Sequence, residues 1–386
     1  MKTNITVIGD YILDRYIYGK VNRISPESPI PVFEEIATEN RHGGSGNVAE
    51  NLRALGADVR HYYDNKHHSI KNRYVCDHHI MFRSDFEEYR INEDVDFDLD
   101  DIKYCILSDY NKGFLHHSLE IIKQCHAKGC IVIVDPKKHL KNYKGADYIK
   151  LNDKELSKYT DGEDYQTILE KYQIGALIVT QGSRGVFVYS RDFQEHIPCE
   201  QHQVSDVTGA GDVFIAAMAF FLAKGKPLIQ SVSKANTLAS LSVTKFGTYT
   251  LKNEDIRQAK TVFTNGCFDI LHKGHVEYLK KSKELGSKLI IGLNSDDSVR
   301  KLKGTDRPIN SQEDRKAILE SLDCVDEVII FDEETPYELI KQIKPDIITK
   351  GGDYKPEEVV GNDLCDVVII PLVEGKSTTN IIERIR

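Results

Sequence analysis

Two histidines, His272 and His275, lie in the segment TNGCFDILHKGHVEYL, which covers residues 264–279. A spacing of three places both rings on one face of the first turn of a helix, and the glycine between them lets phosphate oxygens approach the backbone. Imidazole N–H groups and the positive end of the helix stabilise charge that builds on phosphate oxygens. The pattern predicts attack by one phosphate on the α-phosphorus of a nucleoside triphosphate.

A second candidate site is the Gly-rich turn DVTGAGD at 206–212, which precedes an apolar helical stretch. Gly209 and Gly211 allow a ligand to approach the backbone closely, and the helix start directs free N–H groups at it. Asp212 is well placed to take a proton from an attacking hydroxyl. A plain turn would also explain this segment alone, so the prediction of phosphoryl transfer depends on the motifs around it.

Short apolar runs alternate with helical patterns such as 118–129 and 311–323, which predicts an α/β fold with doubly wound parallel sheets. The runs expected to form strands are 5–10, 104–109, 130–135, 148–152, 176–182, 261–266, 288–296, 327–332, 347–353 and 367–372. Several of them end in Asp, Asn or Gly, at the sheet edge where such folds carry their ligand crevice.

The alternation restarts near residue 260, after the polar, helix-like stretch TYTLKNEDIRQAK. We therefore expect two domains, at 1–258 and 259–386. The size of the chain, 386 residues, agrees with such a division.

Composition limits the classes of partner. The formal net charge of −9 argues against nucleic acid or an anionic membrane as a ligand. We find no signal peptide and no apolar run long enough to span a bilayer, and the eight cysteines form no CxxC pair. These features predict a cytoplasmic protein with reduced thiols. A zinc site at His67, His68, Cys76, His78 and His79 is disfavoured, because adjacent strand residues point to opposite faces.

Further motifs precede the Gly-rich turn in a fixed order: GDYILDRY (9–16), RISPESPIPV (23–32), GGSGNVAENLRALG (43–56), SDYNKG (108–113), VDPKK (134–138), KLNDKE (150–155) and TQGSRG (180–185). The set resembles the ribokinase-type sugar kinase family across the whole first domain. The resemblance is closest to the kinase half of the bifunctional ADP-heptose synthases, and it implies a ribokinase-like fold.

The resemblance also implies residue roles. Asp212 would be the catalytic base, and Gly209, Ala210 and Gly211 would form the anion hole. The residues expected at the sugar are Asp10, Asp14, Gly43, Gly44 and Asn47. Those expected at the kinase nucleotide are Asn152, Glu155, Thr180, Gly182 and Asn236, with Glu155 contacting Mg²⁺ indirectly through water.

One departure from the family lies between GGSGN and RSDFEEYR, where the chain is shorter and contains DNKHHSIKNRYVCDHH (64–79). The family usually has part of the sheet and of the flap over the sugar there. We therefore expect an incomplete lid. This leaves open the alternative that the first domain is a catalytically idle binding module beside an active second domain.

The second domain resembles the HxGH nucleotidylyltransferase superfamily, which implies a Rossmann-like fold. The resemblance rests on GCFDILHKGH (266–275) together with NSDDSVRKLKG (294–304), RPINSQEDR (307–315), KGGDYKPEE (350–358) and EGKSTTNII (374–382). It implies that Asp269, His272 and His275 line the reacting phosphates. It also places Lys303, Arg315, Ser377, Thr378 and Thr379 at the nucleotide. The last three residues could equally cap the final helix.

Together the two resemblances imply consecutive steps with ATP as substrate and Mg²⁺ as cofactor. The first is phosphorylation of D-glycero-β-D-manno-heptose 7-phosphate at O1. The second is adenylyl transfer to the 1-phosphate, which gives ADP-heptose and pyrophosphate. Another sugar or polyol phosphate, or CTP in place of ATP, remains open. The family associates and so implies a homodimer, but the sequence itself leaves the oligomeric state open.

Overall fold

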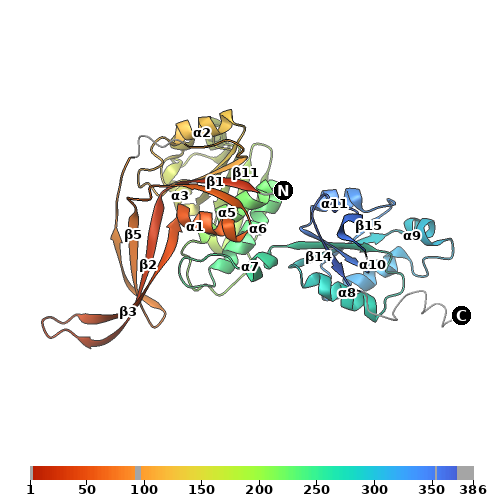
Figure 1. Cartoon of the computed structure of the whole chain (residues 1–386). Coiled ribbons are helices and arrows are strands. Elements are labelled where there is room, and N and C mark those ends of the chain that lie inside the picture. The colour runs from red at the N-terminus through yellow and green to blue at the C-terminus, as the bar shows by residue number, and fades with distance from the viewer. Residues whose placement is uncertain (1–2, 92–96, 353, 372–386) are drawn as a thin grey trace. The chain divides into compact units, whose positions relative to one another are not determined.

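The computed structural model of the chain describes residues 3–91, 97–352 and 354–371. It divides the chain into two compact units, Met1–Asp255 and Ile256–Arg386, which are described separately (Figure 1).

The first unit contains a large sheet in its main layer. Its strands are β1 (Asn4–Gly9), β4 (Asp58–Tyr62), β7 (Tyr104–Ser108), β8 (Ile131–Asp135), β9 (Tyr148–Asn152), β10 (Ala176–Thr180), β11 (Val186–Ser190) and β12 (Gln194–Ile197). Their order is β12-β11-β10-β9-β8-β7-β1-β4, so β4 is an edge strand. The strands from β4 to β10 in this order pair in parallel, whereas β11 and β12 pair antiparallel.

Helices cover both faces of this sheet, as expected for a doubly wound domain. They are α1 (Ser45–Ala54), α2 (Ser118–Ala127), α3 (Asp153–Tyr159), α4 (Tyr165–Tyr172), α5 (Ala210–Ala223) and α6 (Leu228–Ser242). The short helix α7 (Asn253–Gln258) spans the boundary between the two units. The apolar helix α5 packs against α1, α6 and the sheet, while α2 and α4 contribute to a core on the other face. Among the described residues, no helix has the length and apolar character needed to cross a membrane.

A second, smaller sheet was not predicted from the sequence (Figure 1). Its strands are β2 (Tyr11–Ile24), β3 (Pro31–Gly44), β5 (Ser69–Cys76) and β6 (His79–Phe86), in the order β3-β2-β5-β6. The segment expected to leave the lid incomplete thus supplies two strands of this sheet, and the chain passes directly from edge strand β4 to β5. The side chains of β3 and β6 are mostly exposed.

The second unit contains the strands β13 (Thr261–Gly266), β14 (Lys288–Asn294), β15 (Glu327–Phe331), β16 (Ile347–Gly351) and β17 (Asp366–Ile370). All pair in parallel, in the order β15-β14-β13-β16-β17. Its helices are α8 (Lys273–Lys283), α9 (Asp296–Lys303), α10 (Gln312–Glu320) and α11 (Tyr337–Ile343). Residues of α8 and α10 pack in one hydrophobic cluster and those of α11 in another, so the sheet has a core on each face.

Candidate active sites

The first candidate site is built around the start of α5. Gly209 precedes the helix with φ of 78°, a left-handed conformation that favours glycine. A Cβ at Gly209 would lie 2.7 Å from Asn47 Nδ2, and one at Gly211 would lie 2.7 Å from Lys150 Nζ. The two glycines therefore leave room for a polar group from α1 and an ammonium from β9 beside the helix start. Ala210, the third residue of the predicted anion hole, is the first residue of α5.

Asp212 lies in the first turn of α5 and is buried. Its Oδ2 accepts a hydrogen bond of 3.0 Å from Asn47 Nδ2, and its Oδ1 accepts one of 2.5 Å from the Tyr110 hydroxyl. Asn47 is itself oriented by Asn51, whose amide donates to Asn47 Oδ1 at 2.9 Å. Burial raises the pKa of Asp212 to about 6, against the lowering effect of these two donors. A carboxyl with this pKa is ionised at neutral pH yet basic enough to accept a proton.

Two lysines provide positive charge beside the helix start. Lys150 Nζ lies 3.4 Å from both carboxylate oxygens of Asp135. Lys137 forms ion pairs with Glu155 and, at 3.9 Å, with Asp135. Burial alone would lower the pKa of Lys137, but Asp135 and Glu155 raise it, so the ammonium stays charged. This pair of cations suits an anionic ligand.

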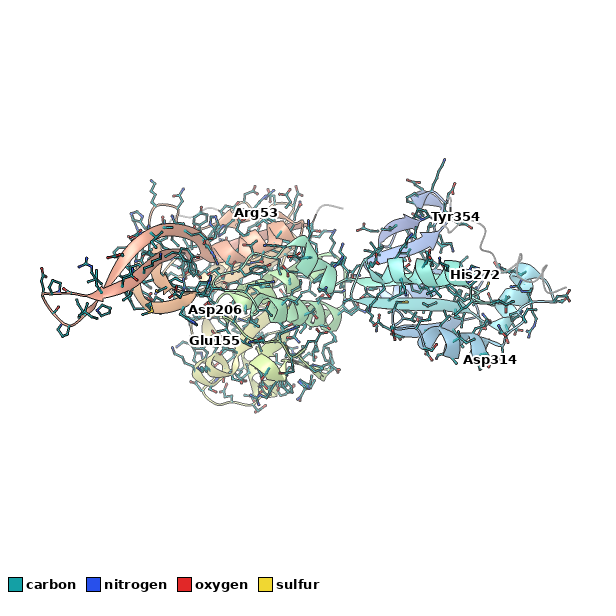
Figure 2. All side chains as sticks on the ribbon, turned by 90° about the horizontal axis from the view of Figure 1, so that it is seen from below. Arg53, Glu155, Asp206, His272, Asp314 and Tyr354 are labelled. Atoms are coloured by element: carbon teal, nitrogen blue, oxygen red, sulfur yellow. The ribbon has the colours of Figure 1, made fainter. Side chains whose placement is uncertain are left out.

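The predicted nucleotide residues lie at the ends of strands and at one helix. Asn152 caps α3: its Oδ1 accepts from the backbone of Glu155 at 3.0 Å, and Glu155 Oε2 accepts from Asn152 N at 3.0 Å. Figure 2 marks Glu155 in the first unit. Thr180 ends β10, Gly182 follows it, and buried Asn236 of α6 donates to Pro198 O at 3.0 Å. Their contacts with a nucleotide stay predictions.

Asp10 organises the loop that follows β7. Its carboxylate accepts backbone N–H bonds from Tyr110 at 2.8 Å, Lys112 at 3.0 Å and Phe114 at 3.1 Å. Burial raises the pKa of Asp10, and the negative charge of Asp109 adds to the rise. Asp10 therefore holds loop 110–114 in place, besides facing a pocket.

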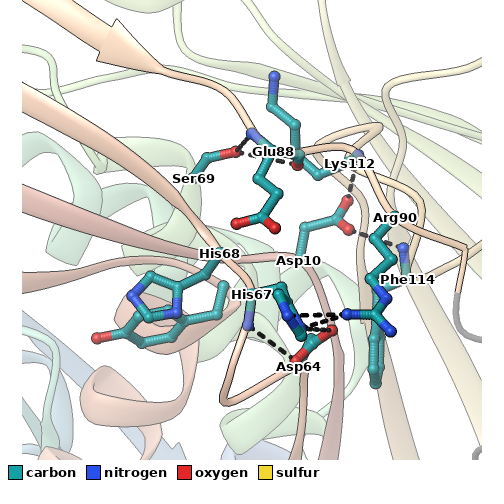
Figure 3. Close-up of a pocket in the computed structure, with 10 residues that line it drawn as sticks. Asp10, Asp64, His67, His68, Ser69, Glu88, Arg90, Lys112 and Phe114 are labelled. Carbon is teal, nitrogen blue, oxygen red and sulfur yellow. Dashed lines mark hydrogen bonds and ion pairs between the residues drawn. The ribbon is translucent and has the colours of Figure 1, made fainter.

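Figure 3 shows this pocket. It is lined by Asp10, Tyr11, Asp64, His67, His68, Ser69, Glu88, Arg90, Lys112 and Phe114. The segment between β4 and β5 thus forms one wall, with Arg90 Nη1 2.7 Å from His67 Nδ1. Asn47 and Asp212 are not among its lining residues.

Asp14, predicted at the sugar, is instead part of a buried ion pair. Its Oδ1 lies 2.5 Å from Arg73 Nη1, and its Oδ2 accepts from the Thr248 hydroxyl at 2.6 Å. Gly43 is required here because a Cβ would lie 2.5 Å from Asp14 Oδ2. Gly44 precedes α1 with φ of 58°. Asp14 and Arg73 therefore join β2 to β5 at the base of the second sheet, and contact of Asp14 with the sugar stays a prediction.

We expect Arg73→Ala to lower the free energy of unfolding by about 3–5 kcal/mol, because it leaves the Asp14 carboxylate buried without its cation. Urea unfolding of the full chain measures this loss. Arg23→Ala is the matched control in the same sheet, since the Arg23–Glu34 pair is 59% and 49% exposed. Its expected cost is at most about 1 kcal/mol. Equal losses in the two variants would contradict the assignment of Asp14 to a structural pair.

The second candidate site begins at α8, where His272 is the N-cap (Figure 2). Its Nδ1 accepts from His275 N at 3.4 Å, and the two rings stack with centroids 3.8 Å apart. Burial lowers the pKa of His275 to about 4, and the neighbouring His272 and Lys303 add to the fall. His275 Nδ1 is buried without a hydrogen-bond partner among the described residues. A neutral imidazole has one N–H group, which at a helix start can donate a hydrogen bond to a phosphate oxygen.

Asp269 lies just before this helix and is buried. Its carboxylate accepts from Ile309 N at 2.8 Å and from Asn310 N at 3.0 Å, and it pairs with Arg307 Nε at 2.6 Å. Burial alone would raise the pKa of Asp269, but the backbone donors and Arg307 hold it below its usual value. Asp269 thus ties the HxGH loop to 307–310. Lys303, at the exposed end of α9, is near enough to influence His275 electrostatically.

Arg315, predicted at the nucleotide, is bound by several loops of the site. Its guanidinium donates to Cys267 O at 2.7 Å, Asn294 O at 2.8 Å and Asn310 O at 3.1 Å, and it pairs with Asp296 at 2.7 Å. The side chain has no exposed surface and links the loops of the site, and its contact with a nucleotide stays a prediction. Ser377, Thr378 and Thr379 lie outside the described residues.

Several site residues received no role from the sequence. They are Tyr110, Lys137 and Lys150 around Asp212, and His67, His68, Arg90 and Lys112 in the pocket. The sequence could have indicated three of them, because Tyr110, Lys137 and Lys150 lie inside motifs recognised above. Nothing in the pattern of 64–90 indicated that this segment forms a pocket wall.

Comparisons with known proteins agree with this geometry. Residues 97–255 match the pfkB family of carbohydrate kinases, and residues 263–384 match the cytidylyltransferase-like family. The first unit is similar in fold to a ribokinase from Thermotoga maritima (TM-score 0.52, 21% identity, 65% of this chain and 97% of that one). It is also similar to phosphofructokinase-2 from Escherichia coli in complex with potassium (TM-score 0.54, 18% identity, 66% and 97%).

Two curated relatives extend over both units. The bifunctional protein HldE of a Nitratiruptor species is 40% identical over 463 aligned positions, covering 100% of both chains. HldE of Pseudomonas fluorescens is 37% identical, covering 99% of this chain and 97% of that protein. An alignment of 463 positions against 386 residues means that the first relative contains stretches absent here. The chain therefore belongs to the family of bifunctional HldE proteins, enzymes that combine a carbohydrate kinase domain with a cytidylyltransferase-like nucleotidyltransferase domain.

Proposed function

We propose that the chain catalyses two ATP-dependent steps between D-glycero-β-D-manno-heptose 7-phosphate and ADP-heptose. The first phosphorylates O1 and gives the 1,7-bisphosphate, and the second transfers AMP to the sugar 1-phosphate after a separate phosphatase has removed the 7-phosphate. The observation that carries the proposal is the presence of two helix-start sites in one chain. One has the buried carboxylate of Asp212, and the other has the paired imidazoles of His272 and His275. A kinase that makes a sugar 1-phosphate and a transferase that consumes one form a consistent sequence.

In the first step, Asp212 accepts the proton of the O1 hydroxyl as its oxygen attacks the γ-phosphorus of ATP. The oxygen–phosphorus bond to the sugar forms as the bond to ADP breaks. The start of α5 and Lys150 stabilise the charge on the transferred group. Asn47 keeps the Asp212 carboxylate in orientation through its 3.0 Å bond.

In the second step, an oxygen of the sugar 1-phosphate attacks the α-phosphorus of ATP, and pyrophosphate leaves. His272 and His275 donate hydrogen bonds to the phosphate oxygens, on which charge builds. The position of both imidazoles at the start of α8 supports this role. Lys303 adds positive charge from the end of α9.

Mg²⁺ is implied for both steps because polyphosphate charge must be neutralised during attack. The described residues contain no group of three or more His, Cys, Asp or Glu side chains that could hold a metal. Glu155 is already engaged by Lys137 and by the backbone of Asn152. This arrangement fits a cation carried by the nucleotide phosphates, with Glu155 reaching it through water.

The direct test supplies ATP, Mg²⁺ and the heptose 7-phosphate, and follows ADP, the sugar 1,7-bisphosphate, pyrophosphate and ADP-heptose. We expect ADP and the 1,7-bisphosphate from this mixture, and pyrophosphate and ADP-heptose once a phosphatase that removes the 7-phosphate is added. Sugar 1-phosphate supplied without the first step should give ADP-heptose and pyrophosphate only. Absence of any phosphorylated or nucleotidylated sugar would overturn the proposal.

The kinase step should have an acidic limb in its pH profile near pH 6, because Asp212 must be ionised and its pKa is raised to about 6. Below this pH the base is protonated and kcat falls; above it kcat reaches a plateau. The profile is measured at saturating ATP and sugar. The residual activity of Asp212→Asn, which has no titrating carboxyl there, is the control. A limb that persists unchanged in this variant belongs to another group.

The choice of nucleotide in the second step is a separate question, because the family matched by residues 263–384 is described as cytidylyltransferase-like. Turnover with ATP and with CTP, each with supplied sugar 1-phosphate, decides it. We expect ATP to be preferred. A preference for CTP would retain the two-step chemistry and change the product.

A further inference from the structure

The Tyr110 hydroxyl is hydrogen-bonded to Asp212, the proposed catalytic base, and the surrounding contacts hold the tyrosine side chain in this position. It donates to Asp212 Oδ1 at 2.5 Å, while the backbone N–H of Tyr110 donates to Asp10 Oδ2 at 2.8 Å. Lys71 of β5 and Lys137 each place an ammonium 5.6 Å from the centre of the Tyr110 ring, within the range of cation–π attraction. Elements from both sheets therefore fix this one side chain.

The carboxylate of Asp212 still has hydrogen-bonding capacity for a substrate. An ionised carboxylate offers about four lone-pair positions. Tyr110 occupies one on Oδ1 and Asn47 occupies one on Oδ2. The remaining positions are sufficient for the sugar hydroxyl that donates its proton to Asp212, so Tyr110 can stay in place during the reaction.

We propose that Tyr110 is a positioning residue for the kinase step, whose hydroxyl holds Asp212 by a hydrogen bond that persists while the carboxylate takes the substrate proton. The inference rests on the proposed function of Asp212 as base. Because a donor stabilises the ionised carboxylate more than the neutral acid, Tyr110 also counteracts the effect of burial. It keeps the base available at neutral pH.

The charged groups around the pair are consistent with this role. Those facing Asp212 or Tyr110 are Asp14 of β2, Lys71 of β5, Asp135 of β8, Lys137 in the loop after it and Lys150 of β9. Burial raises the pKa of Tyr110 well above its usual value, and the negative charges of Asp212 and Asp135 add to the rise. The phenol therefore remains protonated and remains a donor.

The test is Tyr110→Phe in the full chain. We expect the acidic limb of the kinase profile to move upward by about one to two pH units, the equivalent of one hydrogen bond to a charged group. At pH 7 kcat should fall, and it should recover at higher pH. Tyr143→Phe is the matched control, because this buried tyrosine donates to a different carboxylate, Asp109, at 2.6 Å. In Tyr143→Phe the acidic limb of the kinase pH profile should stay at the wild-type pH.

A second readout is independent of sugar phosphorylation. Infrared difference titration of the wild-type chain, with Asp212→Asn to assign the carboxyl band, gives the pKa of Asp212 directly. We expect the band to titrate at higher pH in Tyr110→Phe, and this holds even where no heptose is phosphorylated. An unchanged titration would overturn the inference. So would a higher kcat or a lower sugar KM without a shift, because the hydroxyl would then merely block the site.

Discussion

Asp212→Asn is expected to reduce sugar 1-phosphate formation by about 10²- to 10⁴-fold, the range that general-base catalysis contributes. The amide cannot accept the proton of the attacking hydroxyl. It is also nearly the same size as the carboxylate, so the packing of α5 should be retained. The measurement is the rate of ADP release that depends on the sugar phosphate, at pH values well above 6.

The same variant contains its own control, because nucleotidyl transfer from supplied sugar 1-phosphate should proceed at the wild-type rate. Asp192→Asn, an exposed carboxylate of the same unit, should leave both steps unchanged. Kinase activity that survives in Asp212→Asn would defeat the assignment of the base. A wild-type chain that transfers nucleotide but forms no sugar 1-phosphate would instead support the alternative of an idle first domain.

His275→Ala should impair nucleotidyl transfer and leave the kinase step unaffected, the reverse of what is expected for Asp212→Asn. Loss of one donor to developing charge costs about 10²- to 10³-fold in kcat. We therefore expect such a loss in pyrophosphate release from ATP and sugar 1-phosphate, with the kinase step unchanged.

The matched control for the second site is Lys273→Ala. Lys273 lies between the two histidines, but its side chain is 71% exposed and pairs with Glu277 on the helix surface. Its removal should leave nucleotidyl transfer within about twofold of wild type, since an exposed pair of this kind contributes little free energy. Comparable losses in Lys273→Ala and His275→Ala would mean that the helix start, rather than the imidazole, had been damaged.

The parallel strands were predictable because they are buried on both faces and form continuous apolar runs. The runs at 104–109 and 261–266 correspond to β7 (Tyr104–Ser108) and β13 (Thr261–Gly266). The second sheet was not predictable in this way. Strand β3 (Pro31–Gly44) is exposed over most of its length, so its sequence, PVFEEIATENRHGG, shows no alternation between apolar and polar residues.

The residues of the candidate sites likewise fall into those that a local pattern predicted and those that no local pattern predicted. Glycines and an acidic residue at a helix start, or two histidines around a glycine, are local patterns and were found from the sequence. Tyr110 meets Asp212 across 102 positions of the chain, and no local pattern reports such a contact. The contacts of Arg315 were not predicted for a related reason. Its position in a motif does not reveal that main-chain carbonyl groups already use its donors.

The direct passage from edge strand β4 to β5 has a consequence for how this enzyme can change. Residues 64–69 are at once the crossover between the two sheets and a wall of the pocket that Asp10 faces. An insertion or deletion there would alter the reach of the connector and the shape of the wall together. The shape of the pocket wall and the placement of the smaller sheet therefore change together, and we expect loop grafts from longer relatives to alter both.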